Sequence, residues 1–286
     1  MMNIPVAPFT HLLTLWIQIT GTWCNLQCVH CINASGPQDP WLASLDSATV
    51  KRYIQEAEGL GVKEIYFTGG EPFLHEDILE LLTYSLQVAP TTVLTNGTLI
   101  DAEMADALAA LSRAASYSLE IRVSMDATAP EQNDRIRGKG AFRKAVHALQ
   151  LLYARGLLPI LTATEILQHE LSPEQGMHER FRRFLLALGI AKPRMKILPV
   201  FPIGRMAEAG GARLTQEMLQ DFDYSRLQCS ETRVVAKGGV YSCPILAGLP
   251  AARLSHHSLA ESFNPCQLYH PACVTCYQTG MTCKNF

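Results

Sequence analysis

Six short apolar segments alternate with helical segments over the first 200 residues of this 286-residue chain. Each helical segment carries apolar side chains every three or four positions, which is typical of a helix with one buried face. Repeated strand–helix units predict parallel strands joined by right-handed crossovers. Six units are too few for a closed eight-stranded barrel. The sequence therefore predicts an α/β fold with an open, partial (β/α)6 TIM-like barrel, whose strands lie at 13–20, 64–68, 92–95, 121–124, 159–163 and 196–200.

Local signals mark the ends of several helices. Asp46 or Ser47 can cap one helix N-terminus with its side-chain oxygen. Ser172-Pro173 predicts the start of another helix, because proline is favoured at the first helical position. Gly189 is expected to end that helix, since glycine tolerates the left-handed backbone of a C-terminal cap.

The pattern changes after the sixth strand, where turn-forming residues and cysteines dominate. One two-stranded hairpin is predicted between residues 233 and 242, around Lys237-Gly238-Gly239. We therefore expect two units: a barrel over residues 1–212 and a small, metal-organised domain over residues 213–286.

The composition excludes several classes of protein. Lysine and arginine number 24 and aspartate and glutamate 26, so the net charge of −2 argues against a nucleic-acid or membrane-surface partner. The N-terminal apolar stretch is too short to span a bilayer and no lysine or arginine precedes it. We expect a cytoplasmic protein, in which thiols stay reduced.

The nine cysteines fall into two groups. Three lie within eight residues after the first strand, and six lie beyond residue 228. An odd total, a reducing compartment and tight local spacing all argue against disulfides. Metal or iron–sulfur ligation is the better interpretation for both groups.

The first group has the spacing Cys-x3-Cys-x2-Cys, formed by Cys24, Cys28 and Cys31. It directly follows the first strand, so it is expected on a loop at the C-terminal mouth of the barrel. Three thiolates can hold three corners of a cubane iron–sulfur cluster, which leaves the fourth iron open to a substrate. A structural zinc site would need a fourth ligand. His30 is the nominal candidate, but as the neighbour of Cys31 it is expected to point elsewhere.

This spacing and position resemble those of the radical S-adenosylmethionine (SAM) enzymes. The resemblance implies that the open iron chelates the amino and carboxylate groups of SAM. It further implies reductive cleavage of SAM to a 5′-deoxyadenosyl radical, which abstracts hydrogen from a substrate. An electron donor such as flavodoxin or ferredoxin is implied as a partner.

Two further motifs match the same family. Gly69-Gly70-Glu71-Pro72 follows the second strand, and the resemblance implies that it contacts the methionine amino group of SAM. Its simpler interpretation is a glycine-rich turn. Asn96, at the end of the third strand, is either a cofactor contact or a turn residue.

The fourth strand is followed by a second set of candidate cofactor contacts. Ser124 and Asp126 are candidates for the ribose hydroxyls or the methionine carboxylate, with a helix cap as the alternative. Arg137 is a candidate carboxylate clamp, because a guanidinium pairs with carboxylate in bidentate geometry, or else a surface arginine. His30 takes the place of an aromatic residue that the family often has near the adenine. The segment Pro202–Arg205, after the sixth strand, also resembles peptide- and sugar-modifying members.

The second cysteine group resembles the SPASM and twitch extensions of this family, which carry auxiliary 4Fe–4S clusters. Cys229, Gly238 and Cys243 match the opening of that pattern, whereas Cys283 comes one residue late. Six thiols exceed the four that one cubane needs and fall short of the eight that two need. We expect one auxiliary cluster, with two clusters or a zinc site as alternatives. The leading ligands are Cys229, Cys243, Cys273 and Cys276, and Cys266 or Cys283 is a substitute for one of them.

Two classes of substrate remain open. Most similar SPASM-type enzymes modify a peptide or protein by crosslinking, epimerisation or oxidation. The first strand begins near residue 12, so we expect no fused peptide-recognition domain, and a leader peptide would require a separate partner. The short cysteine-rich domain instead favours a small-molecule oxidoreductase, such as a sugar or aminocyclitol dehydrogenase. A third alternative, a non-catalytic iron–sulfur or zinc protein, is disfavoured by the Gly69-Gly70-Glu71 loop.

Overall fold

The computed structural model describes residues 4–38, 40–166, 176–208 and 210–280. Its main sheet has nine strands in the order β10-β9-β8-β2-β3-β4-β5-β6-β7. The six strands from β2 to β7 run parallel to their neighbours, so the predicted partial barrel is confirmed. Their bounds are β2 Thr14–Gln18, β3 Glu64–Thr68, β4 Thr91–Thr95, β5 Leu119–Ser124, β6 Ile160–Thr164 and β7 Met195–Leu198.

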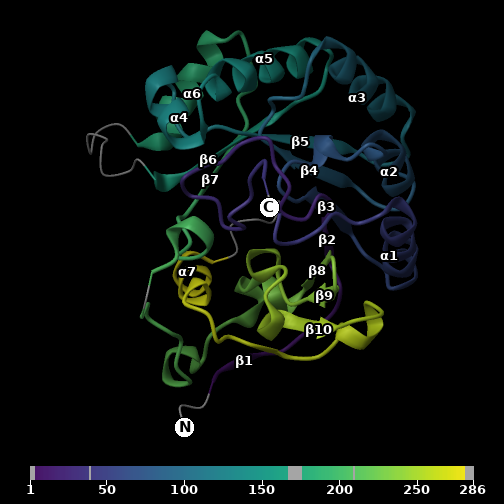
Figure 1. The fold of residues 1–286 in the computed structure, drawn as a ribbon, viewed down its shortest axis with the longest axis vertical. Coiled ribbons are helices and arrows are strands. Elements are labelled where there is room, and N and C mark those ends of the chain that lie inside the picture. Colours follow the sequence, from purple (N-terminus) through teal and green to yellow (C-terminus); the bar gives the residue numbers. More distant parts are fainter. Residues whose placement is uncertain (1–3, 39, 167–175, 209, 281–286) are drawn as a thin grey trace.

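Helices α1 to α6 cover the outer face of the parallel strands β2 to β7 in one continuous arc (Figure 1). The main apolar core lies between the two layers, where Ile17, Phe67 and Val93 are fully buried. Burial of a side chain of this size stabilises the fold by about 1.5–3 kcal/mol. The bounds are α1 Ser47–Gly59, α2 Ile78–Ser85, α3 Ala102–Ala114, α4 Pro130–Arg137, α5 Ala141–Ala154 and α6 Met177–Ala187.

The predicted helix ends agree with the structure where residues are described. Asp46 accepts a hydrogen bond from the Thr49 amide at 2.8 Å and so caps α1. Gly189 has a φ of +84° just after α6. The predicted start of that helix at Ser172-Pro173 lies outside the described residues. Helix α4 has only one aliphatic side chain beyond its initial proline, Ile136, so its sequence gave no helical periodicity to detect.

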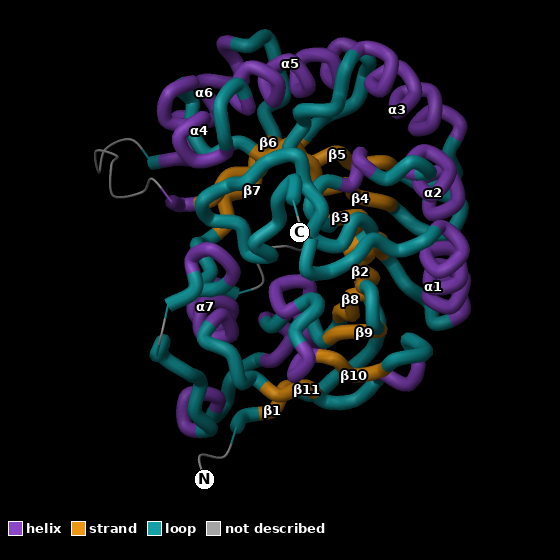
Figure 2. Tube along the Cα trace, in the orientation of Figure 1, coloured by secondary structure: helices purple, strands orange, loops and turns teal. Residues whose placement is uncertain are grey.

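The C-terminal segment continues the same sheet. Strands β8 (Thr232–Ala236) and β9 (Gly239–Tyr241) form the predicted antiparallel hairpin. Strand β8 also pairs in parallel with β2, and β10 (Arg253–Ser255) extends the edge beyond β9. The cysteine-rich segment therefore lies directly against the first strand of the barrel (Figure 2).

Two smaller elements complete this region. Strand β1 (Val6–Ala7) pairs with β11 (Cys266–Gln267), which ties the start of the described chain to the cysteine-rich segment. Helix α7 (Ala272–Thr279) lies apart from the outer arc, beyond the end of β7 (Figure 1). Among the described residues, no helix is long and apolar enough to cross a membrane.

Candidate active site

A cavity of about 220 Å³ opens at the C-terminal ends of the parallel strands, and the first three cysteines line it. This is the expected position, since the loops that follow barrel strands meet at that face. The other predicted residues that line the cavity come from the segments that follow β2, β3 and β4, from the end of β5 and from the end of α4, and they are His30, Gly69, Gly70, Asn96, Ser124 and Arg137.

Backbone amides and carbonyls hold the cysteine loop in shape. The Leu26 amide donates to Cys24 Sγ at 3.4 Å, and the Ser35 amide donates to Cys31 Sγ at 3.3 Å. The Cys28 thiol donates to the Arg137 carbonyl at 3.8 Å. Burial raises the pKa of Cys24 to about 12 and also raises that of Cys28, so a metal centre must displace protons to bind here.

Arg205 clamps this loop from the segment that follows β7. Its guanidinium donates to the carbonyls of Cys28 at 2.8 Å and Ser35 at 2.5 Å, and its amide donates to the Cys31 carbonyl at 3.1 Å. Gly204 has a φ of +62°, and a Cβ atom there would lie 2.2 Å from the Cys31 carbonyl oxygen. The Gly204-Arg205 motif therefore shapes the cysteine loop.

The Gly69-Gly70 loop packs directly against the backbone that leads into the cysteines. A Cβ atom on Gly70 would lie 1.9 Å from the Trp23 carbonyl oxygen. The Glu71 amide donates to that same oxygen at 3.0 Å. Glycine is therefore required for the close approach of the two loops.

The Glu71 carboxylate is fully buried and does not line the cavity. It accepts from Thr95 Oγ1 and from the Asn96 amide, each at 2.7 Å, and from the Phe73 amide at 3.2 Å. Burial raises its pKa to about 7, although these three hydrogen bonds act in the opposite direction. In this arrangement Glu71 fixes the end of β4, and Asn96 presents its side chain to the cavity.

Asp126 is likewise buried behind the cavity wall. Its carboxylate lies 2.8 Å from His30 Nε2 and 2.7 Å from Arg137 Nε, and it accepts from the Thr164 amide at 2.8 Å. Burial alone would raise the pKa of Asp126, but the Arg137 charge and the His30 contact outweigh it and hold the pKa well below its usual range. Asp126 thus orients His30 and Arg137, both of which line the cavity.

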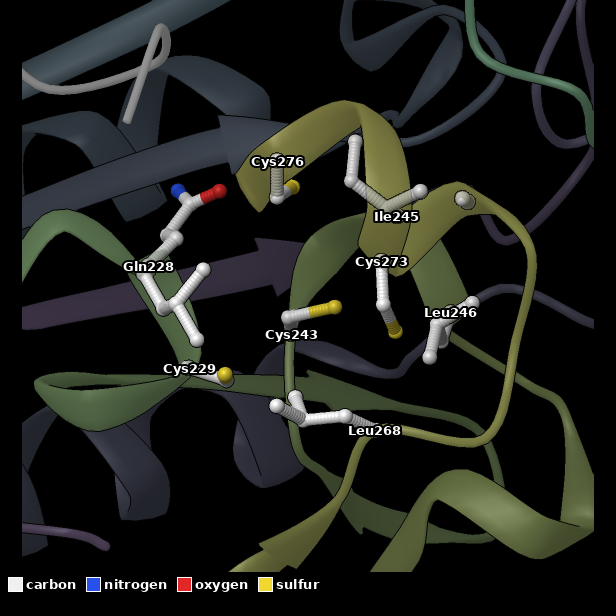
Figure 3. A pocket seen from close by; sticks show the side chains of 10 residues that line it. Gln228, Cys229, Cys243, Ile245, Leu246, Leu268, Cys273 and Cys276 are labelled. Atoms are coloured by element: carbon white, nitrogen blue, oxygen red, sulfur yellow. The ribbon is translucent and has the colours of Figure 1, made fainter. Parts of the chain in front are cut away.

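The second cysteine group surrounds a smaller cavity of about 30 Å³. Figure 3 shows Cys229, Cys243, Cys273 and Cys276 around this space, with Ile245, Leu246 and Leu268 as apolar walls. These four cysteines are the leading set from the sequence. They come from three places: η6 (Gln228–Ser230), the residue before η7 (Pro244–Leu246), and α7.

Cys266 adjoins this cavity but does not line it. The Cys229 thiol hydrogen-bonds to Cys266, and this contact together with burial raises the pKa of Cys229 well above its ordinary value. Burial also raises the pKa of Cys243 to about 12 and that of Cys273 to about 11. Cys283 lies outside the described residues.

The donor sets fit iron–sulfur clusters better than single ions. Within the described ranges, no three His, Cys, Asp or Glu side chains are close enough together to hold one metal ion. A cubane cluster needs no such convergence, because each thiolate binds a different iron. Thiolate is also the donor that such clusters take.

Sequence reasoning missed most of the residues that line the two cavities, and it also missed a buried arginine beside the second one. Trp16 and Gln18 line the larger cavity from alternate positions of β2, and the two-residue period of a strand was the available signal. Ile245 lines both cavities. Arg233 is fully buried beside the second cysteine group and donates to the Cys229 carbonyl at 2.9 Å.

The fold and the cysteine-lined cavity at its mouth define an α/β partial-barrel protein with a thiol site at the C-terminal ends of its strands, and comparison with known proteins gives its family. Residues 19–175 match the family model of the Radical SAM superfamily, and this is more than half of the chain. The chain therefore belongs to the radical SAM superfamily. Membership implies a 4Fe–4S cluster and SAM as cofactors.

Individual relatives give a narrower comparison. Mycofactocin maturase MftC of Mycobacterium ulcerans (strain Agy99) is 34% identical over 186 residues, 65% of this chain and 47% of that protein. AdoMet-dependent heme synthase of Methanosarcina barkeri (strain Fusaro / DSM 804) is 30% identical over 199 residues, 69% of this chain and 53% of that protein. The alignments thus span about half the length of these two relatives.

A solved structure extends the likeness in fold. Streptococcus suis SuiB, bound to the precursor peptide SuiA, superposes with a TM-score of 0.67 over 89% of this chain and 65% of SuiB. Sequence identity over this match is 16%, so the match establishes the fold.

Proposed function

We propose that this protein reductively cleaves SAM and abstracts hydrogen from a peptide or protein substrate. The observation that carries the proposal is the convergence of Cys24, Cys28, Cys31 and the Gly69-Gly70 loop on one cavity at the barrel mouth. A cluster on the three cysteines would supply the electron that cleaves SAM to a 5′-deoxyadenosyl radical.

The chain's own residues would bind and orient the cofactor. Asn96 Nδ2 lies 3.8 Å from Cys24 Sγ and donates to Asn25 Oδ1 at 2.9 Å, so its amide stands beside the thiol site. Arg137 is the one arginine among the described lining residues, and its charge suits the methionine carboxylate of SAM. His30 and Arg137 are held in place by Asp126.

We further propose that Cys229, Cys243, Cys273 and Cys276 hold one auxiliary 4Fe–4S cluster in a SPASM- or twitch-like domain. The apolar walls of that cavity would keep water from the cluster, and solvent exposure is one of the factors that set its potential. The positive charge of buried Arg233 would balance the thiolates. Residues 213–286 would form the domain, even though β8 joins the barrel sheet.

Support for a peptide substrate comes from the relative named as a maturase and from the fold shared with SuiB. A leader-binding protein and an electron donor such as flavodoxin or ferredoxin would complete the system. The second candidate is a small-molecule substrate, and the relative named as a heme synthase favours it.

Anaerobic reconstitution tests the proposal. Protein with SAM and dithionite is expected to form 5′-deoxyadenosine, measured by mass spectrometry. The Cys24→Ala, Cys28→Ala, Cys31→Ala triple variant is expected to form none while it retains iron at the second site. Cleavage by the triple variant would refute the assignment of the active cluster.

A further inference from the structure

Several residues that line the larger cavity carry a buried polar atom with no hydrogen-bond partner among the described residues, and two of these atoms belong to alternate positions of β2. Trp16 and Gln18 are 3% and 1% exposed, and both line the cavity. Trp16 Nε1 and Gln18 Oε1 make no hydrogen bond, whereas Gln18 Nε2 donates to the Gly21 carbonyl at 3.1 Å. An unpaired buried polar group costs about 1–3 kcal/mol, so a bound ligand is the natural partner.

The two atoms are a donor and an acceptor. The indole N–H of Trp16 can only donate, and Gln18 Oε1 can only accept. They sit two positions apart on β2, a spacing of about 6.6 Å along a strand. A peptide backbone offers the complement, because each residue carries one acceptor carbonyl and one donor amide.

Part of the cavity lining is an apolar wall. It consists of Leu198 at the end of β7, the residues Pro199, Val200 and Phe201 that follow, and Pro244-Ile245 of η7. Phe201 and Ile245 belong to one buried apolar cluster, and Leu198 packs against it. Asn96, Ser124 and Arg137 are polar members of the same lining.

The cavity lining carries little charge. Arg137 is the single fully charged side chain among the described lining residues, and Asp126 pairs with it. A charged group against the apolar wall would lose its water without gaining a counter-charge, which is costly.

We infer that the cavity binds a peptide segment whose reacting residue has an uncharged, apolar side chain. Trp16 and Gln18 bind the backbone of that residue, and Phe201, Pro244 and Ile245 contact its side chain. This inference rests on the proposed function and narrows its substrate class. Because Ile245 also lines the second cysteine cavity, the reacting residue lies one side chain away from that site.

Binding of capped amino acids tests the inference without turnover. The holoenzyme with SAM and no reductant is titrated with N-acetyl-leucine methylamide, N-acetyl-glutamate methylamide and the ester analogue 2-acetoxy-4-methylpentanoic acid methylamide. Saturation-transfer NMR gives the affinities. The leucine amide is expected to bind at least about tenfold more tightly than the glutamate amide. It is also expected to bind several-fold more tightly than the acetoxy ester, in which an oxygen replaces the leucine N–H that donates to Gln18.

Variants assign the contacts. Gln18→Leu is expected to abolish the preference for amide over ester. Ile245→Asp is expected to weaken leucine amide binding more than tenfold, and the milder Ile245→Thr several-fold. Leu186→Asp, at a 41% exposed apolar position on α6, is the matched control and should bind like wild type. Retained SAM binding and iron content show that each variant is folded.

The outcomes separate this inference from the proposed function. If reductant yields no 5′-deoxyadenosine, the proposed function fails. If 5′-deoxyadenosine forms but leucine and glutamate amides bind equally, the inference fails alone. Preferential binding of iron coproporphyrin III or of an aminosugar would also overturn it.

Discussion

Replacing Asp126 by asparagine removes the one negative charge that holds His30 and Arg137 against the cavity. The carboxylate lies 2.7 Å from Arg137 Nε and 2.8 Å from His30 Nε2, and all three side chains are at most 9% exposed. Asparagine keeps an acceptor for the Thr164 amide but leaves the guanidinium without its counter-charge.

The structure sets the size of the effect. Opposite charges about 4 Å apart attract by about 4 kcal/mol at an effective dielectric constant of about 20. Breaking one side of a buried ion pair costs about 3–5 kcal/mol. For a chain of this length that loss lowers the unfolding temperature by roughly 10 °C.

The dependence on pH has a definite sign. The pKa of Asp126 is lower in the folded state than in the unfolded chain, so its contribution is complete above the unfolded pKa of about 4. It is lost as the pH falls toward the folded-state pKa. The difference between wild type and Asp126→Asn should therefore stay constant from about pH 5 to 7 and shrink below about pH 4.

A double-mutant cycle with Arg137→Gln in anaerobic thermal unfolding isolates the pair. The double variant should be more stable than the sum of the single losses predicts, by about 0.5–3 kcal/mol. An Asp126→Asn loss below about 1 kcal/mol, or strict additivity, would refute this role for Asp126.

Three further predictions concern the loops and the iron content. Gly70→Ala should weaken SAM binding at least about tenfold in equilibrium dialysis, because its Cβ would meet the Trp23 carbonyl; Gly59→Ala, with nothing within 4 Å, is the control and should match wild type. The pKa of Glu71 is raised to about 7, so the free energy of unfolding of wild type should fall as the pH rises from about 4.5 to 7, by up to about 1.4 kcal/mol per pH unit. The Glu71→Gln variant should lack this pH dependence. The same pH dependence in the variant as in wild type would contradict the role of the buried carboxylate. Reconstituted wild type should contain about eight irons. About four should remain when alanine replaces Cys229, Cys243, Cys273 and Cys276. Zinc bound at these four cysteines would contradict an auxiliary cluster.

The parts of the fold that follow local rules could be predicted from the sequence. All six barrel strands carry short apolar runs, and glycines or capping residues bound the helices between them. The Cys24–Cys31 spacing locates the thiol site, because it follows the first strand. Helix α4 could not be predicted, because Asn133 and Arg137 are buried there in place of apolar residues.

The orientation of the carboxylates also could not be predicted. Glu71 and Asp126 both follow strands whose loops reach the cavity, but their partners are distant in the chain. The pairing of Glu71 with Thr95 depends on how the neighbouring strands β3 and β4 align. The pairing of Asp126 with His30 joins the segments after β5 and β2, which are not neighbours in the sheet. Long-range pairing likewise places β8 beside β2, which no local pattern encodes.

Electron paramagnetic resonance of the reduced protein tests the central claim most directly, since it reports whether a cluster on Cys24, Cys28 and Cys31 has an iron open to SAM. The variant with alanine at Cys229, Cys243, Cys273 and Cys276 should show one 4Fe–4S signal, and addition of SAM should change that signal. The triple alanine variant at Cys24, Cys28 and Cys31 should keep a signal that SAM leaves unchanged. A SAM-dependent change in the triple variant, or none in the quadruple variant, would contradict the account.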